Sequence, residues 1–221
     1  MRINTPDGFK LDTIFLRGKN SQKGILFAHG MTVAKEDEGI FIRAQQKLNS
    51  LGFSTLMFDF RTHGKSSGDS TDDFTISGEL IDLETAVQFM KKQGIKWLGL
   101  AGASFGGSIS ALYAGQNPSM IQKLFLANPV LDYNTAFLHP TNVWALKTFD
   151  NFSGKLKHFG FIEVASRKFK VGKRLFDEMP KYFPYKELSN YKKPLIIVQG
   201  DNDEKVNIPS SRNDRNPLEG I

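Results

Sequence analysis

The sequence predicts an α/β fold with a mostly parallel, doubly wound sheet, and two observations support this prediction. The first is a set of five short apolar runs, at 24–30, 54–60, 97–103, 123–129 and 194–200, each followed by a turn signal. Their nearly continuous hydrophobicity is typical of parallel strands covered on both faces. The second is the helical pattern between the runs, because alternating strands and helices favour a parallel sheet with right-handed crossovers.

The elements before the central strands can be placed in chain order. Residues 3–17 alternate around Asp7-Gly8, which predicts an antiparallel hairpin at one edge of the sheet. Two helices, each ending at a glycine, are expected within 37–52 and 77–94. The apolar face of the first would carry Ile40, Ala44, Leu48 and Leu51. That of the second would carry Leu80, Leu83, Val87 and Met90.

A third helix is expected directly after Ser104, ending before Pro118. The alternation of strands and helices is then interrupted in the second half of the chain. From 131 to 188 the strand–helix pattern breaks, and we interpret this stretch as an inserted cap with a hairpin that turns near Ser166-Arg167 and a short helix after it. The predicted domains are therefore an N-terminal core (1–130), the cap (131–188) and a C-terminal part of the core with an atypical tail (189–221).

Length and composition exclude several classes of protein. The 221 residues are enough for one α/β domain with a sizeable core. Without cysteine, neither a disulfide framework nor a thiolate metal site can form, and we expect no metal and no cofactor. The polar N-terminus lacks the apolar region of a signal peptide, and no apolar run reaches the roughly 18 residues that span a bilayer. We expect a cytoplasmic protein with no membrane partner.

The positive charge of the chain is concentrated in one segment. Between Lys147 and Lys193 the formal charge is +7, against +6 for the whole chain. Basic residues interleaved with aromatic ones can bind single-stranded nucleic acid. We instead interpret the segment as an insertion with a solvated basic face, because no nucleic-acid-binding motif accompanies the charge. No nucleic-acid partner is expected.

The segment GASFGG, residues 102–107, fits the pattern G-x-S-x-G, with Ser104 between Gly102 and Gly106. In this pattern a sharp strand-to-helix turn raises the serine hydroxyl above the edge of the sheet, and small neighbours relieve the crowded backbone. The following helix N-terminus directs free N–H groups at developing negative charge. Because the segment lies between a predicted strand and a predicted helix, we interpret Ser104 as a nucleophile. A glycine-rich turn that only packs helix against strand is the alternative.

Three further loops follow the ends of predicted strands: AHGMT (28–32), FDFRTHGKSSGDS (58–70) and QGDNDEKV (199–206). With the GASFGG segment they resemble the α/β-hydrolase superfamily. The closest resemblance is to small cap-bearing esterases, a group of feruloyl and cinnamoyl esterases and relatives similar to S33 serine aminopeptidases. The resemblance covers residues 1–208 and implies an α/β-hydrolase fold.

The resemblance also implies roles for individual residues. The backbone N–H groups of Met31 and Phe105 would form an oxyanion hole, which can supply several kcal/mol of transition-state stabilisation. His29 and Gly30 would shape the loop that carries Met31. Asp203 would be the acid of a catalytic triad, orienting an imidazole and stabilising its charged form.

Other positions in the loops are assigned structural roles by the same resemblance. Asp201 would be a turn residue, and His63 would be structural. Thr62 stands where the family usually has glycine. An acidic turn that caps the strand end is the alternative reading of the 199–206 loop.

The histidine that the triad requires is missing. The family order is Ser, Asp, His, but none of the four histidines follows Asp203; they are His29, His63, His139 and His158. The polar stretch from 207 to 221 also holds no strand of adequate length, so the last strand of the fold is expected to be absent. The chain could be truncated or frameshifted, which we favour, or a non-catalytic member. Alternatively, His139 or His158 of the cap could replace the base.

The sequence therefore predicts a serine hydrolase of carboxylic esters, of carboxylesterase or aryl/feruloyl type, that acts through an acyl-enzyme on a small-molecule ester. Activity is expected to be impaired, because loss of a triad member costs about 10⁴ to 10⁶ in kcat. The alternatives are a non-catalytic binding protein on the same fold, and a thioesterase or serine peptidase that uses the same residues. A missing last strand would leave 194–200 at the sheet edge, which predicts self-association through that edge.

Overall fold

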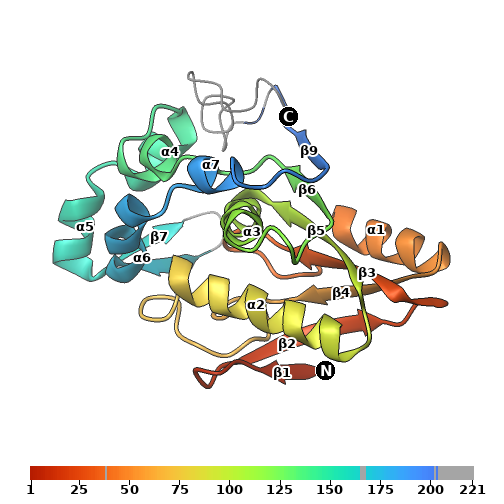
Figure 1. Ribbon diagram of the computed structural model, residues 1–221. Helices are drawn as coiled ribbons and strands as arrows, with labels where there is room; N and C mark the ends of the chain where they lie inside the picture. The colour runs from red at the N-terminus through yellow and green to blue at the C-terminus, as the bar shows by residue number, and fades with distance from the viewer. Residues whose placement is uncertain (38, 165–167, 202, 204–221) are drawn as a thin grey trace.

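A computed structural model describes residues 1–37, 39–164, 168–201 and 203. In this part of the chain one large sheet has the strand order β1-β2-β4-β3-β5-β6-β9 (Figure 1). The strands are β1 (Arg2–Asn4), β2 (Lys10–Leu16), β3 (Asn20–Ala28), β4 (Phe53–Phe58), β5 (Trp97–Ala103), β6 (Lys123–Ala127) and β9 (Leu195–Val198). β2 is antiparallel to β1 and β4, and the other neighbours are parallel. The edge hairpin and the mostly parallel sheet are confirmed.

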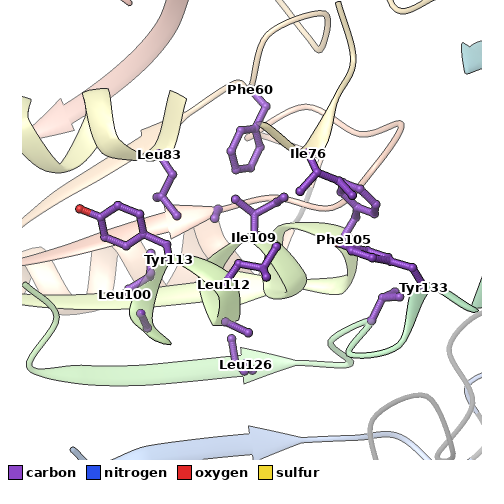
Figure 2. Close-up of a cluster of buried hydrophobic side chains, with 14 of the residues drawn as sticks. Phe60, Ile76, Leu83, Leu100, Phe105, Ile109, Leu112, Tyr113, Leu126 and Tyr133 are labelled. Atoms are coloured by element: carbon purple, nitrogen blue, oxygen red, sulfur yellow. The ribbon is translucent and has the colours of Figure 1, made fainter. Parts of the chain in front are cut away.

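Helices cover both faces of the sheet, as expected for a doubly wound fold. They are α1 (Gly39–Ser50), α2 (Ile76–Lys92) and α3 (Ser104–Gln116). Strand residues alternate between two apolar clusters, so that Leu26 and Leu56 face α2 and α3, whereas Phe27 and Met57 face α1. The first cluster is much the larger, and Figure 2 shows its side chains converging between α3 and the sheet. Burying this face supplies the main driving force for the fold.

The apolar faces of the two predicted helices are only partly confirmed. In α2, Leu83, Val87 and Met90 are buried. In α1 the buried residues are Phe41 and Gln45, whereas Ile40 and Leu51 are exposed at 51% and 61%. The prediction for α1 was wrong at these positions because the Phe41 ring packs on Phe27, at 5.1 Å between centroids, and the Gln45 amide donates to the carbonyl of Ile14 at 3.3 Å.

The segment between β6 and β9 forms a group of short elements, most of which lie at one side of the sheet, whereas α7 lies against α3 (Figure 1). The elements are η1 (Asn134–Leu138), α4 (Val143–Phe149), α5 (Phe152–Phe159), β7 (Phe161–Val164), β8 (Phe169–Gly172), α6 (Lys173–Glu178), η2 (Met179–Lys181) and α7 (Pro184–Leu188). β7 and β8 pair as the expected hairpin, followed by the expected short helix α6. The turn at Ser166-Arg167 lies outside the described residues. The division into 1–130, 131–188 and 189–221 stays a prediction.

The β6–β9 segment is fastened to the core at the start of α2. The carboxylate of Glu178 accepts hydrogen bonds from the backbone N–H and the hydroxyl of Ser77, at 2.9 and 2.6 Å. The Arg174 guanidinium donates to the carbonyl of Asp72 at 2.8 Å. The ring of Phe169, from β8, stacks on His63 at 4.6 Å. These contacts fix where the segment sits relative to the ends of the parallel strands.

β9 is the last strand of the sheet in the described part of the chain, and it pairs there with β6. Its side chains alternate, leaving Ile196 and Val198 exposed at 61% and 51%. The tail 204–221, on which the prediction of a missing strand rests, lies outside the described residues. Among those that are described, no helix is both long and apolar enough to cross a bilayer.

Self-association through the β9 edge remains a prediction. We expect the chain to form dimers or larger species as its concentration rises, because an apolar edge strand can pair with a second chain. Ile196→Lys, which places a charge on that strand, should shift the population toward monomer. Sedimentation velocity of both proteins across a concentration series measures this. A wild-type chain that stays monomeric at the highest concentration contradicts the prediction.

Candidate active site

Ser104 lies at the junction of β5 and α3, where the chain turns sharply. Its backbone φ is +51°, in the left-handed region that non-glycine residues seldom adopt. Its carbonyl oxygen accepts a hydrogen bond from the N–H of Val130 at 3.2 Å, which ties the turn to the loop after β6. Such a conformation costs about 1–3 kcal/mol and persists only where surrounding contacts enforce it.

Two glycines make this turn possible. A Cβ on Gly106 would lie 2.5 Å from the carbonyl oxygen of Ala28, and closer still to that of His29. A Cβ on Gly102 would meet the hydroxyl oxygen of Ser110 first and would lie 2.7 Å from the carbonyl oxygen of Gly106. Because the obstructing atoms at both positions include backbone atoms, a side chain at either one would force α3 away from β3 and β5.

A cavity of about 390 Å³ opens above Ser104. The cavity walls contain four further residues to which the sequence assigned a role, Gly30, Met31, Phe105 and Asp203. The structure therefore brings together the predicted nucleophile, the two predicted oxyanion donors and the predicted acid, which are far apart in the sequence. The rest of the wall is mostly apolar and includes Phe137 and Trp144 from the β6–β9 segment. The catalytic roles themselves stay predictions.

The backbone around Phe105 is rigidly held. Phe105 is in the first turn of α3, where N–H groups have no acceptor within the helix. Its ring is buried and contacts the rings of Phe74, Tyr133 and Phe137, with centroids 5.4, 5.5 and 6.0 Å away. Figure 2 shows Phe105 and Tyr133 side by side at this end of the buried cluster. The packing suits an N–H that must keep a constant direction toward an oxyanion.

His29 is buried and both ring nitrogens are occupied. Nε2 lies 3.0 Å from the backbone N–H of Phe60, which can only donate, so Nε2 is the acceptor. The proton is therefore on Nδ1, which donates to the carbonyl of Gly30 at 2.8 Å. Burial lowers the pKa of His29, which keeps the ring neutral. This geometry agrees with a residue that shapes the loop of Met31.

His63 is also buried, between the core and β8. Its Nδ1 donates to the carbonyl of Arg61 at 2.9 Å, and its ring stacks on Phe169. Burial, together with the nearby His29, lowers the pKa of His63 to about 3. Asp201 is in an exposed turn after β9. These placements agree with the structural roles expected of both residues.

Thr62 has a φ of +66°, so the residue that replaces the usual glycine retains the backbone conformation of a glycine. A β-branched residue is strained there. We expect Thr62→Gly to raise the free energy of unfolding by about 1 kcal/mol and Tm by about 2–4 °C. Thr62→Asn should give a smaller gain, because asparagine tolerates this region better. Thermal unfolding measures both, and a glycine variant less stable than the wild type contradicts the prediction.

Glu79, in the first turn of α2, is buried beside His63. Its Oε1 lies 3.9 Å from His63 Nδ1, too far for a hydrogen bond, and Oε2 has no partner among the described residues. Burial, reinforced by the carboxylate of Asp82, raises the pKa of Glu79 well above its usual range. The folded protein therefore retains a proton here that the unfolded chain releases.

Stability should consequently fall as pH rises above the ordinary pKa of a glutamate, 4.5, toward the raised folded pKa of Glu79. The fall can reach about 1.4 kcal/mol per pH unit. Glu79→Gln, which has the shape of the protonated acid, should match the wild type at pH 4 and be more stable at pH 8. Urea unfolding at both pH values measures the difference. Glu163→Gln, at an exposed position, is the control. A difference between Glu79→Gln and the wild type that is the same at both pH values would refute the assignment.

The two candidate replacement bases lie outside the lining of the cavity above Ser104. His139 is exposed at the end of η1, and His158 is exposed in α5 with its ring against Phe159. Neither lines the cavity above Ser104, and the described residues that do line it include no histidine. The structure thus brings together Ser104 and the predicted oxyanion donors and acid, and the described residues of this cavity include no histidine beside them.

Asn128 is hydrogen-bonded to the loop after β9 that contains Asp203, a role that the sequence analysis missed. It has a φ of +44°, and its side-chain oxygen accepts from the N–H of Gly200 at 2.8 Å. The N–H of Asp203 in turn donates to the carbonyl of Gly200 at 3.3 Å. The sequence feature that could have indicated this role is the Asn-Pro pair directly after the strand. Asparagine is the residue besides glycine that adopts a positive φ most readily.

Lys35 holds the Met31 loop and was also missed. It is 2% exposed, and its ammonium group donates to Asp12 and Asp59 at 2.6 and 2.9 Å. Burial alone would lower the pKa of Lys35, but the hydrogen bonds to both carboxylates raise it. The backbone N–H of Lys35 also donates to Asp59, at 2.7 Å. A fully buried ion pair thus ties the loop after β3 to the end of β4.

The strand order, the helices on both faces and the sharp turn at Ser104 define an α/β-hydrolase fold. The family model described as serine aminopeptidase, S33, matches residues 19–179, which is more than half of the chain, and the chain belongs to this family. It is accordingly a hydrolase of an esterase-like α/β-hydrolase group. No curated protein matches the sequence.

Similar solved structures agree with this assignment. The chain is similar to Est1E from Butyrivibrio proteoclasticus, solved with ferulic acid bound, with a TM-score of 0.76, 25% identity and coverage of 96% of this chain and 82% of that one. It is also similar to the esterase Pf2001 of Pyrococcus furiosus, with a TM-score of 0.68, 23% identity and coverage of 96% and 74%. A protein from Agrobacterium vitis S4 shares the fold, with a TM-score of 0.74, 18% identity and coverage of 96% and 82%.

Proposed function

We propose that the protein is a serine hydrolase of carboxylic esters in which Ser104 is the nucleophile. The observation that carries the proposal is the joint lining of one cavity by Ser104, Met31, Phe105 and Asp203. The strained φ of Ser104 supports it, because strain of this kind gathers at functional sites. The similarity to Est1E, whose structure holds ferulic acid, supports an ester substrate with an aryl or acyl group of moderate size.

The reaction would proceed through an acyl-enzyme. The Ser104 hydroxyl oxygen attacks the ester carbonyl carbon, and the N–H groups of Met31 and Phe105 stabilise the resulting oxyanion. The bond from the carbonyl carbon to the alcohol oxygen then breaks, and the alcohol leaves with the proton that serine gave up. Water attacks the acyl-enzyme next, releasing the carboxylic acid and restoring the hydroxyl of Ser104.

The proton transfers in this scheme require a base, and no histidine follows Asp203 in the sequence. Turnover of the 221-residue chain is therefore expected to be slow, by about 10⁴ to 10⁶ in kcat relative to a complete triad. An imidazole supplied from solution can act as the missing base if the cavity admits it.

The experiment is hydrolysis of phenyl acetate by the chain and by Ser104→Ala, with and without imidazole in the buffer. We expect the wild type to turn over slowly and imidazole to increase its rate. The increase should be larger than in the Ala variant, which measures the background reaction of imidazole with the ester. Mass spectrometry after treatment with an aryl phosphonofluoridate should find the adduct on Ser104. Equal rates in both proteins, with no adduct, would refute the proposal.

The second candidate is a non-catalytic binding protein on the same fold, and the described cavity wall, which includes no histidine, favours it. It predicts that the wild type and the Ala variant have equal rates without imidazole and that imidazole increases both rates by the same amount. A thioesterase or a serine peptidase would use the same residues, and the S33 family description makes the peptidase the relevant comparison. Amino-acid arylamides and acyl thioesters, assayed beside phenyl acetate, distinguish these activities.

A further inference from the structure

A second cavity lies within the β6–β9 segment, outside the site described above. It has a volume of about 610 Å³ and is bounded by α4, α5 and β7. Figure 1 shows these three elements gathered at one side of the molecule, beyond the end of the sheet. Trp144 and Val164 line both this cavity and the one above Ser104. The two cavities therefore adjoin across these two side chains.

The second cavity has an apolar floor and a charged rim. Ile162 and Val164 are buried, and Phe159 is 62% exposed, which is unusual for so large an apolar side chain. The rim carries Lys147 from α4 and Lys155 from α5. The Lys155 ammonium group donates one hydrogen bond, to the carbonyl of Thr148 at 3.2 Å, and thereby stays beside the cavity.

One acidic residue, Glu163, also lines the rim. The three charged side chains at the rim therefore sum to +1, and a negatively charged group would meet two ammonium groups against one carboxylate. The +7 charge of the surrounding segment 147–193 adds to this field at low ionic strength. The net charge of the rim would repel a cationic group and would give a neutral group no net Coulombic attraction.

We infer that this cavity binds the end of the substrate remote from the ester, and that this end is an apolar chain or ring carrying a carboxylate. The inference rests on the proposed ester hydrolysis at Ser104 and adds a substrate class to it. The apolar part would lie on Ile162 and Phe159, and the carboxylate would accept hydrogen bonds from Lys147 and Lys155. The ester would extend past Trp144 to the serine.

Binding tests this inference without any need for turnover. Octanoate, 1-octanol and octylammonium share one chain length and differ in charge, and isothermal titration calorimetry at low ionic strength gives their affinities. We expect octanoate to bind about fivefold to tenfold more tightly than 1-octanol, and octylammonium to bind most weakly. The double variant Lys147→Met/Lys155→Met, which retains the aliphatic stems, should abolish the preference for octanoate.

Two further variants locate the effect. Lys157→Met removes an exposed lysine of α5 that does not line the cavity, and should leave the preference unchanged. Glu163→Gln should tighten binding of octanoate by about twofold. Equal affinities for the three probes, no binding of any of them, or a preference that survives the double lysine variant would each overturn the inference.

Hydrolysis distinguishes this inference from the proposed function. The monophenyl ester of suberic acid carries a free carboxylate, and the double lysine variant should hydrolyse it with a lower kcat/KM than the wild type. For phenyl octanoate, which has no carboxylate, the two proteins should have the same kcat/KM. If the chain hydrolyses esters but binds the three probes equally, the proposed function stands and the inference about the second cavity is refuted. If the chain binds octanoate through the two lysines but hydrolyses no ester, the carboxylate-binding cavity stands and the proposed function is refuted.

Discussion

Asp59→Ala is expected to lower the free energy of unfolding by about 3–5 kcal/mol, which is a large part of the stability of an ordinary domain. The Asp59 carboxylate is fully buried and accepts hydrogen bonds from the ammonium and backbone N–H groups of Lys35 and from the N–H of Lys65, at 2.9, 2.7 and 2.9 Å. Its removal leaves the buried ammonium of Lys35 with Asp12 as its remaining close partner, because the Glu36 carboxylate lies 3.8 Å away. In the wild type, burial would lower the pKa of Lys35, but the hydrogen bonds to Asp12 and Asp59 raise it, so the buried group carries its charge in the neutral pH range.

Urea unfolding of a small set of variants isolates this effect. Asp12→Ala should cost less, because the Asp12 side chain is 19% exposed and water can partly replace it. The double variant Lys35→Met/Asp59→Asn should lose less stability than the sum of its two single variants, because it removes both charges. Strictly additive losses would show that the two groups do not form a coupled pair in the folded protein.

The parts of the fold that the sequence predicts are those with local signals. The parallel strands are recognisable because each is a short apolar run, and the turn at Ser104 because strand, glycines and helix follow one another. The buried face of α1 is different. It depends on Gln45 finding a carbonyl on β2 and on Phe41 meeting Phe27 on β3, and no feature of the helix sequence alone contains that information.

Some residues of the candidate site could likewise be predicted from local sequence signals, and others could not. Ser104, Met31, Phe105 and Asp203 could be named because each lies in a motif directly after a strand. Lys35 could not, since its burial requires residues 12, 35 and 59 to meet, and only the folded sheet brings those loops together. The site of the base could not be predicted either, because the family pattern places it where the sequence has no histidine.

Gly106→Ala is expected to be severely damaging, with a loss of about 3–5 kcal/mol or a failure to accumulate folded protein. The added methyl would press against the backbone carbonyls of Ala28 and His29, and neither can yield without moving β3. The same displacement would separate the N–H of Phe105 from that of Met31. The loss of ester hydrolysis should therefore exceed what the fraction of folded protein explains.

A graded series of glycine variants keeps this prediction measurable even if Gly106→Ala does not fold. Gly39→Ala, at the exposed start of α1, would place its Cβ 3.5 Å from the flexible end of Arg43 and should change stability by less than about 0.5 kcal/mol. Gly107→Ala, 3.0 and 3.1 Å from the Cβ and Cα of Pro129, should be intermediate. Thermal unfolding and soluble yield should rank the three as 39, 107 and 106 in order of increasing damage. A Gly106→Ala protein as stable as Gly39→Ala would mean that α3 can move away from β3 at little cost, so that close packing under Ser104 is not what holds its strained backbone.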